Sequence, residues 1–215
     1  MYGLVHNNRI QVGPRTWSYN FFNDYLVENN LDNSELSRND PAGPIITSEW
    51  KILPVTSLIQ PSYDNKFEQL AGPYWSINES DITGYYDIAD MSVDSSKSIL
   101  KSIVTDNRYK VETGKLLFTF SDGQEVQLFT SREDRSTYLD AYLIMADDAT
   151  ITFKFVNSVF RAVTKTELNQ IVATGSNHIK TCFEWEAQKH AEIDACVNLN
   201  ELKSIELRHP SQIVE

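Results

Sequence analysis

The uneven distribution of proline is the feature that most constrains the fold of this chain. Six of the seven prolines lie within the first 73 of 215 residues, and only Pro210 follows them. Proline lacks a backbone N–H donor, so it interrupts helix interiors and central strands. We therefore predict an irregular, β-rich region over residues 1–90, a regular α+β domain over residues 91–208, and a short tail over residues 209–215.

A few short elements are expected in the proline-rich region. Asn tolerates positive φ, so Asn7-Asn8 predicts a hairpin turn between Tyr2–His6 and Ile10–Val12, and Gly13-Pro14 should end the hairpin. The aromatic spacing that follows predicts a helix over residues 16–30. Beyond a polar loop at 32–44, short strands are expected at 49–58, 74–77 and 84–88.

Aromatic side chains in the same region are candidates for a surface that contacts other proteins. Extended chain leaves backbone groups that a neighbouring subunit can satisfy, and large aromatics are common in interfaces. Trp185 lies much later, on the helix side opposite Cys182 and Phe183, where a partner or packing against the N-terminal region would explain it equally well. The predicted interface comprises Trp17, Phe21, Phe22, Trp50, Trp75 and Trp185.

The region after residue 91 has a clearer pattern. Its apolar spacing predicts a helix over 92–109, and Asp122-Gly123, where both residues tolerate positive φ, predicts a tight hairpin turn. Capping-box spacing at Thr130–Glu133 predicts a second helix, and Asn157-Ser158 marks a second hairpin. Another capping box, Thr164–Glu167, opens a long helix. The order helix, hairpin, helix, hairpin, long helix indicates antiparallel strands.

Charge and apolar patterning exclude several classes of partner. With 19 basic and 30 acidic residues the chain has a net charge of −11 and repels phosphate backbones and anionic membranes. We therefore expect neither nucleic acid nor a membrane as partner. No run of about 18 apolar residues is present to cross a membrane, and the first residues lack a secretory signal. Cys182 and Cys196 lie roughly 21 Å apart along one predicted helix, so we predict two free thiols.

A search for catalytic patterns gives no site. No glycine-rich phosphate loop is present, Ser98–Lys101 lacks the partner motifs of an acyl-enzyme serine, and Asp81–Gly84 has no second copy with which to share a proton. We therefore predict no catalytic residue and no cofactor. A glycoside hydrolase would need two carboxylates about 5 to 9.5 Å apart, and 30 acidic residues offer many pairs that only a structure can test.

The long helix carries the best metal-ligand pattern in the chain. His178, Cys182, Glu186 and His190 recur every four residues and so share one face. Ligands spread over about three turns cannot converge on one ion, and a zinc site needs ligands from more than one turn or element. We predict no metal, with Cys182 in the core and the other three at a surface or an interface. Gly175 is the weak point of this helix.

Several spaced motifs in the second half are similar to an uncharacterised C-terminal domain of tailed-phage tail proteins. As in that family, an Arg-Tyr-x-x-Glu segment at 108–112 precedes a glycine turn, and Thr-x-Arg at 130–132 begins a helix. Thr164–Leu168 and His178–Glu184 resemble two further family segments. The similarity covers residues 92–205. The chain departs from the family at Phe153-Lys154, where a Trp-Lys pair is common, and at His209-Pro210, where many members have Trp-Pro.

The resemblance implies a virion protein without a reaction of its own. Members of such families are tail-fibre, baseplate or fibre-assembly proteins. We therefore expect a structural component of the tail or baseplate, present in multiple copies, assembled in the bacterial host cytoplasm and bound to other tail or baseplate proteins. The alternative is a tail-fibre assembly chaperone that is not retained in the virion.

Overall fold

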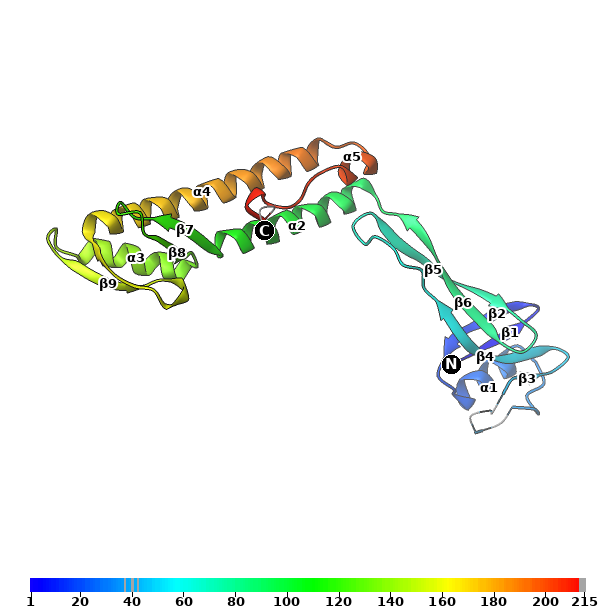
Figure 1. The fold of residues 1–215 in the computed structure, drawn as a ribbon. Helices are drawn as coiled ribbons and strands as arrows, with labels where there is room; N and C mark the ends of the chain where they lie inside the picture. Colours follow the sequence, from blue (N-terminus) through cyan, green and yellow to red (C-terminus); the bar gives the residue numbers. More distant parts are fainter. Residues whose placement is uncertain (37, 40, 42, 213–215) are drawn as a thin grey trace. The chain divides into compact units, whose positions relative to one another are not determined.

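The computed structural model describes residues 1–36, 38–39, 41 and 43–212, which form two compact units. Unit 1 is Met1–Met91 and unit 2 is Ser92–Glu215 (Figure 1). The predicted boundary near residue 90 lies next to the observed one. Both units contain helices and strands, which confirms the α+β class. No helix among the described residues is long and apolar enough to cross a membrane.

The described residues of unit 1 form a six-stranded mixed sheet and one helix, where the proline content predicts irregular chain. The strands follow the order β2-β1-β4-β6-β5, with β3 beside β4, and among these described strands only β4 and β6 pair in parallel. The prediction of a β-rich region is confirmed, whereas the expectation of irregular structure is wrong. The elements are β1 Tyr2–His6, β2 Arg9–Arg15, α1 Tyr19–Glu28, β3 Ile45–Ile46, β4 Trp50–Ile59, β5 Glu68–Ile77 and β6 Ile82–Asp90.

The prolines of the sheet lie at positions where the strand needs no backbone N–H donor. Pro14 lies in β2, an edge strand, so the hairpin continues past Gly13-Pro14 instead of ending there. Pro54 lies in β4 between the residues that pair with β3 and those that pair with β6. Pro73 occupies a bulge in β5, where Gly72 and Pro73 together lie opposite Tyr86 alone. Pro14 and Pro73 thus fall outside the paired registers, and Pro54, which lies opposite Tyr2 of β1, has no registered partner among the described strands on its other side.

The hairpin at Asn7-Asn8 is confirmed, because both residues have positive φ, 54° and 56°, and β1 pairs antiparallel with β2. The helix is shorter than predicted and begins after Ser18. One face of the sheet packs against α1 in a core cluster, and the opposite face holds a smaller cluster of Val5, Leu53 and Ile82. The α1 core comprises Leu4, Val12, Phe22, Leu26, Leu36, Trp50 and Ile52.

Unit 2 has the predicted order of helices and antiparallel hairpins. Its hairpins β7–β8 and β9–β10, together with α3 and the first half of α4, enclose one apolar core. The helices α2 and α4 pack along each other (Figure 1). The elements are α2 Val93–Glu112, β7 Lys115–Thr119, β8 Glu125–Phe129, α3 Arg132–Ile144, β9 Thr150–Lys154, β10 Phe160–Thr164, α4 Lys165–Ala195 and α5 Leu199–Lys203, with 3₁₀ turns at Val156–Ser158 and Pro210–Gln212.

Local hydrogen bonds explain why these elements begin and turn where they do. The capping box of α4 forms as predicted: the Thr164 hydroxyl accepts from the Glu167 amide, and the Glu167 carboxylate accepts from the Thr164 amide. The cap of α3 is Ser131, which accepts from the Asp134 amide, so the predicted box at Thr130–Glu133 is wrong by one residue.

The turn of the first hairpin also differs in detail. In the pair Asp122-Gly123 only Gly123 has positive φ, 84°. The Gly123 amide donates to the Phe120 carbonyl and the Phe120 amide donates to the Gln124 carbonyl. This is the longer hairpin turn that places one glycine in the left-handed region, not the two-residue turn that the dipeptide predicts.

Candidate functional site

The predicted interface residues do not form one surface. Phe22 and Trp50 are buried in the core of unit 1, and the Trp50 indole N–H donates to the Asp32 carbonyl at 2.6 Å. Trp17 and Trp75 are half-buried in the same unit, against Phe22 and beside Gly84. Phe21 alone among the six is exposed, at 39%, with the Arg15 guanidinium 3.5 Å above its ring.

The structure also corrects the predicted exposure of Trp185 at an interface. Its side chain is buried within unit 2, where the His209 ring covers it edge-on at a centroid distance of 4.9 Å. His209, the first residue of the predicted tail, thus contributes to the interior of unit 2. Phe183, placed on the apolar stripe by its spacing, is the more exposed ring and has the Arg108 guanidinium 4.6 Å from its centroid. Three of the six predicted interface residues, Phe22, Trp50 and Trp185, are therefore core residues of this chain.

The four-residue repeat of possible metal ligands marks the contact between α4 and α2. The His178 ring lies 3.0 Å from the Val111 carbonyl, and the His190 ring lies 3.3 Å from the Lys101 carbonyl. The contacts run in opposite directions along the two helices, so the helices are antiparallel. Burial, and next the charge of Glu112, raises the pKa of the Cys182 thiol and keeps it protonated. Within the described residues no group of three His, Cys, Asp or Glu side chains could hold a metal.

The most strongly constrained polar site in unit 2 is an ion network that spans α2, α3 and α4. Glu112, only 1% exposed, forms ion pairs with Arg108 and with Arg135, the second at 3.1 Å. Arg108 also binds Glu186 at 3.0 Å, and Glu186 accepts from the Thr105 hydroxyl. Both oxygens of each carboxylate are thus engaged, which is how a buried charge is tolerated.

Charge alone does not reveal this network in the sequence. Arg132–Arg135 and Glu184–Glu186 have the pattern of solvent-facing charge runs, yet Arg135 and Glu186 form ion pairs within unit 2. The informative signal is the α2 stripe, because residues at four-residue intervals are all buried and its last two members are charged. That stripe is Ser96, Leu100, Val104, Arg108 and Glu112. Charged residues that continue an apolar stripe are expected to pair inside the protein.

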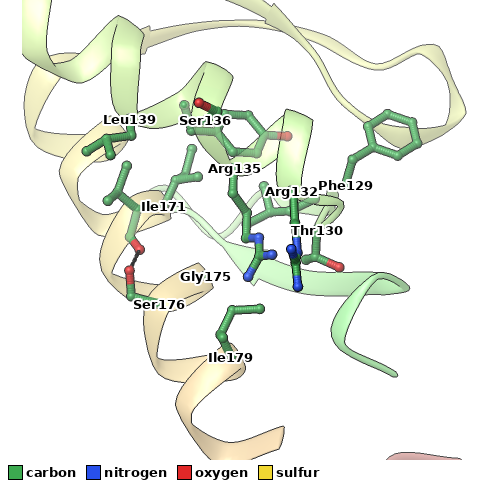
Figure 2. A pocket seen from close by; sticks show the side chains of 13 residues that line it. Phe129, Thr130, Arg132, Arg135, Ser136, Leu139, Ile171, Gly175, Ser176 and Ile179 are labelled. Carbon is green, nitrogen blue, oxygen red and sulfur yellow. Dashed lines mark hydrogen bonds between the residues drawn. The ribbon is translucent and has the colours of Figure 1, made fainter. Parts of the chain in front are cut away.

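A pocket of about 470 Å³ opens beside this network, between β8, the first turns of α3 and the middle of α4 (Figure 2). Among the described residues, its lining contains two arginines, Arg132 and Arg135, and no acidic side chain. Burial raises the pKa of Tyr138 at one wall, and the Asp134 carboxylate adds to this, so the phenol stays neutral. The apolar lining comprises Leu128, Phe129, Leu139, Ile171, Val172 and Ile179.

A second feature is the distal part of the sheet in unit 1, which we call the sheet extension: residues 57–59 of β4, 68–74 of β5 and 85–90 of β6. Here β5 and β4 each pair only with β6 among the described strands, so both outer edges are open (Figure 1). None of its large apolar side chains belongs to either of the two core clusters described for unit 1. The exposed ones are Leu58, Ile59, Tyr74, Tyr85 and Ile88.

The comparisons with known proteins identify one domain. The family model described as Domain of unknown function (DUF4376) matches residues 96–207, just over half of the chain. No curated protein and no solved structure matches the chain at a significant level. The matched range lies within unit 2 and includes the ion network and the pocket.

Proposed function

This chain belongs to the family defined by the DUF4376 domain of unknown function, and we propose that it is a non-catalytic structural protein of a tailed bacteriophage. In this role it acts by packing against other tail or baseplate proteins, in several copies per particle. The motifs at 108–135 and 164–184 support the assignment through their resemblance to tail-protein domains. The assembly chaperone is the alternative that the experiment below separates from it.

The observation that carries a packing role is the sheet extension. A two-stranded ribbon is marginal in water by itself and gains stability when an apolar face packs against another surface. Leu58, Tyr74 and Ile88 are large, exposed and outside both cores of unit 1. Open strand edges also offer unpaired N–H and C=O groups, which another chain can pair with by adding a strand. By the strand registers, Leu58 and Ile88 share one face of the sheet and Tyr74 lies on the other. A partner that pairs with the β4 edge and packs on the first face would bury Leu58 and Ile88 and satisfy that edge.

The open edge of β5 has a feature that disfavours non-specific pairing with strands of other chains. The bulge at Gly72-Pro73 interrupts its ladder, and bulges and prolines are the usual means by which edge strands avoid aggregation. The outer edge of β4 at Ser57–Ile59 has no charge and no proline, and it carries the exposed Leu58 and Ile59. We therefore place the partner contact at β4 and the neighbouring face of β6.

The experiment measures incorporation into particles. Tailed particles are purified from lysates of the phage that encodes the chain, and the protein is quantified by mass spectrometry. We expect a fixed copy number per particle for the wild type and a strong loss for the double variant Leu58→Lys, Ile88→Lys. Both positions are exposed, so each variant should fold, as circular dichroism can verify.

The matched control is Ile144→Lys in unit 2, an aliphatic residue that is 85% exposed and lies outside the sheet extension. Its incorporation should equal that of the wild type. Absence of the wild-type protein from particles would contradict the structural role. If the absent protein co-purifies with tail-fibre subunits from the same lysate, the chaperone role is the correct one.

A further inference from the structure

We propose that the pocket between α3 and α4 binds a small molecule with an apolar body and one carboxylate. This goes beyond the packing role, because it concerns unit 2 and a ligand of different chemistry. The pocket is enclosed by β8, α3 and α4, and its volume of about 470 Å³ lies within the usual range for small-molecule sites.

The walls favour an apolar body. Leu128 and Ile171 belong to or line the core of unit 2, and they extend that apolar environment into the pocket, with Ile179 further along α4. Burial of apolar ligand surface against such walls stabilises a complex by roughly 25 cal/mol per Å² before the costs of association. A purely polar ligand would leave these walls without a complementary surface.

The charge at the pocket favours an anion. Arg132 and Arg135 are one helical turn apart at the start of α3, and both guanidinium groups point toward the α4 side in Figure 2. The described residues of the lining include no acidic side chain, in a chain whose net charge is −11. Arginine presents a planar fork of donors that matches a carboxylate. A cationic or neutral ligand would not use this arrangement.

The two arginines have different roles. Arg135 is fixed by Glu112 at 3.1 Å and donates to the Ser131 carbonyl at 3.3 Å, so its position does not depend on a ligand. No described carboxylate pairs with Arg132, which is exposed at the pocket. Arg132 is therefore the cation that is available to an incoming carboxylate, and Arg135 adds a fixed positive field beside it.

The glycine at position 175 leaves room in the pocket because it has no side chain. Glycine is unfavourable in a helix interior, yet it lies in the middle of α4 and lines the pocket. A Cβ at this position would meet no atom within 4 Å, so close packing does not require the glycine. The absence of a side chain leaves space that a ligand can occupy, and a large residue here would fill it.

The test compares a matched pair of probes, 4-phenylbutyrate and its neutral amide, on the full chain. Binding is followed by isothermal titration and by NMR chemical shifts of residues 128–139 and 171–179. The carboxylate should bind at least about tenfold more tightly than the amide, because a hydrogen bond to a charged group is worth that factor or more. Equal binding of both probes, or binding of neither at millimolar concentration, would overturn the proposal.

Three variants locate the site. Arg132→Gln should reduce carboxylate affinity roughly tenfold and leave amide affinity unchanged, because it removes a charge without disturbing the Glu112 network. Gly175→Leu should abolish binding of both probes, and Gly175→Ala, which improves the helix and adds one methyl group, serves as its folding control. If Arg132→Gln binds the carboxylate like the wild type, or Gly175→Leu leaves binding intact in a folded protein, the pocket is not the site.

Discussion

The two units differ in how their polar groups are paired. In unit 2, buried charged residues have partners within the unit: Glu112 and Glu186 bind arginines and a hydroxyl, and the helices have side-chain caps. Unit 1 has an apolar interior but leaves strand edges and large apolar side chains of the sheet extension without cover. The difference suggests that unit 2 is stable through its own contacts, whereas unit 1 gains from a partner.

Removal of Glu112 tests the first half of this comparison and has the largest expected effect. Glu112→Ala leaves Arg108 and Arg135 without their shared carboxylate in a buried site, which should lower the free energy of unfolding by about 3 to 5 kcal/mol. Hydrogen exchange resolved by peptide should show the loss in unit 2 and not in unit 1. Glu184→Ala, which removes an exposed ion pair with Lys180, should change stability by less than about 0.5 kcal/mol.

A neighbouring pair on α1 tests the interior of unit 1. Phe22→Ala opens a cavity in the apolar core and should cost roughly 3 to 4 kcal/mol, while Phe21→Ala should cost no more than about 1 kcal/mol from its contact with Arg15. Chemical denaturation of the three proteins measures the difference. Similar losses for both variants would show that α1 does not pack as described, and the contrast between the units would then fail.

The caps of unit 2 predict a smaller effect. Thr164→Ala removes a hydroxyl that accepts from the Glu167 amide at the start of α4, and should destabilise unit 2 by about 1 kcal/mol. Thr166→Ala, two residues further and exposed, makes no described cap contact and should be neutral or slightly stabilising. Thermal unfolding distinguishes the two. Equal stability of the two variants would mean that the capping box contributes nothing measurable.

The smallest effect concerns pH and the contact between His209 and Trp185. Burial, followed by the charge of His178, lowers the pKa of His209, and its Nδ1 atom accepts from the Ser211 amide in the neutral form. Because the unfolded chain then takes up the proton more readily than the folded one, stability is full above a pH of about 6.5 and falls as the pH drops below that value.

The measurement is the midpoint of unit 2 unfolding between pH 7 and pH 5, compared with His209→Gln. The variant should lose part of this pH dependence, although its stability at pH 7 is lower because the ring that covers Trp185 is gone. An identical pH dependence in both proteins would show that protonation of His209 does not lower the stability of unit 2. His209 would then stabilise the unit only by packing on Trp185.

Much of unit 2 could be predicted from sequence because its signals are local. The capping box at Thr164–Glu167 and the order of helices and hairpins depend on residues a few positions apart, and the free thiols Cys182 and Cys196 follow from their separation along one helix. The pocket could not be predicted, because Arg132 and Gly175 are 43 positions apart and meet only when α3 packs on α4. The proline content gave a wrong expectation of irregular chain in unit 1, because a strand tolerates proline where its N–H is not needed, and the sequence does not show which strand lies at an edge.

The sequence by itself determined the α+β class, the order of helices and hairpins in unit 2, and the capping box that begins α4. The tertiary structure decided the rest, because burial is a property of packed elements and not of a single one. It turned the His178–His190 repeat into a helix contact, placed Trp185 under His209, and paired Glu112 with two arginines. The sequence of one helix does not show which of its faces will pack against another helix, because that contact also depends on elements that are distant in the sequence.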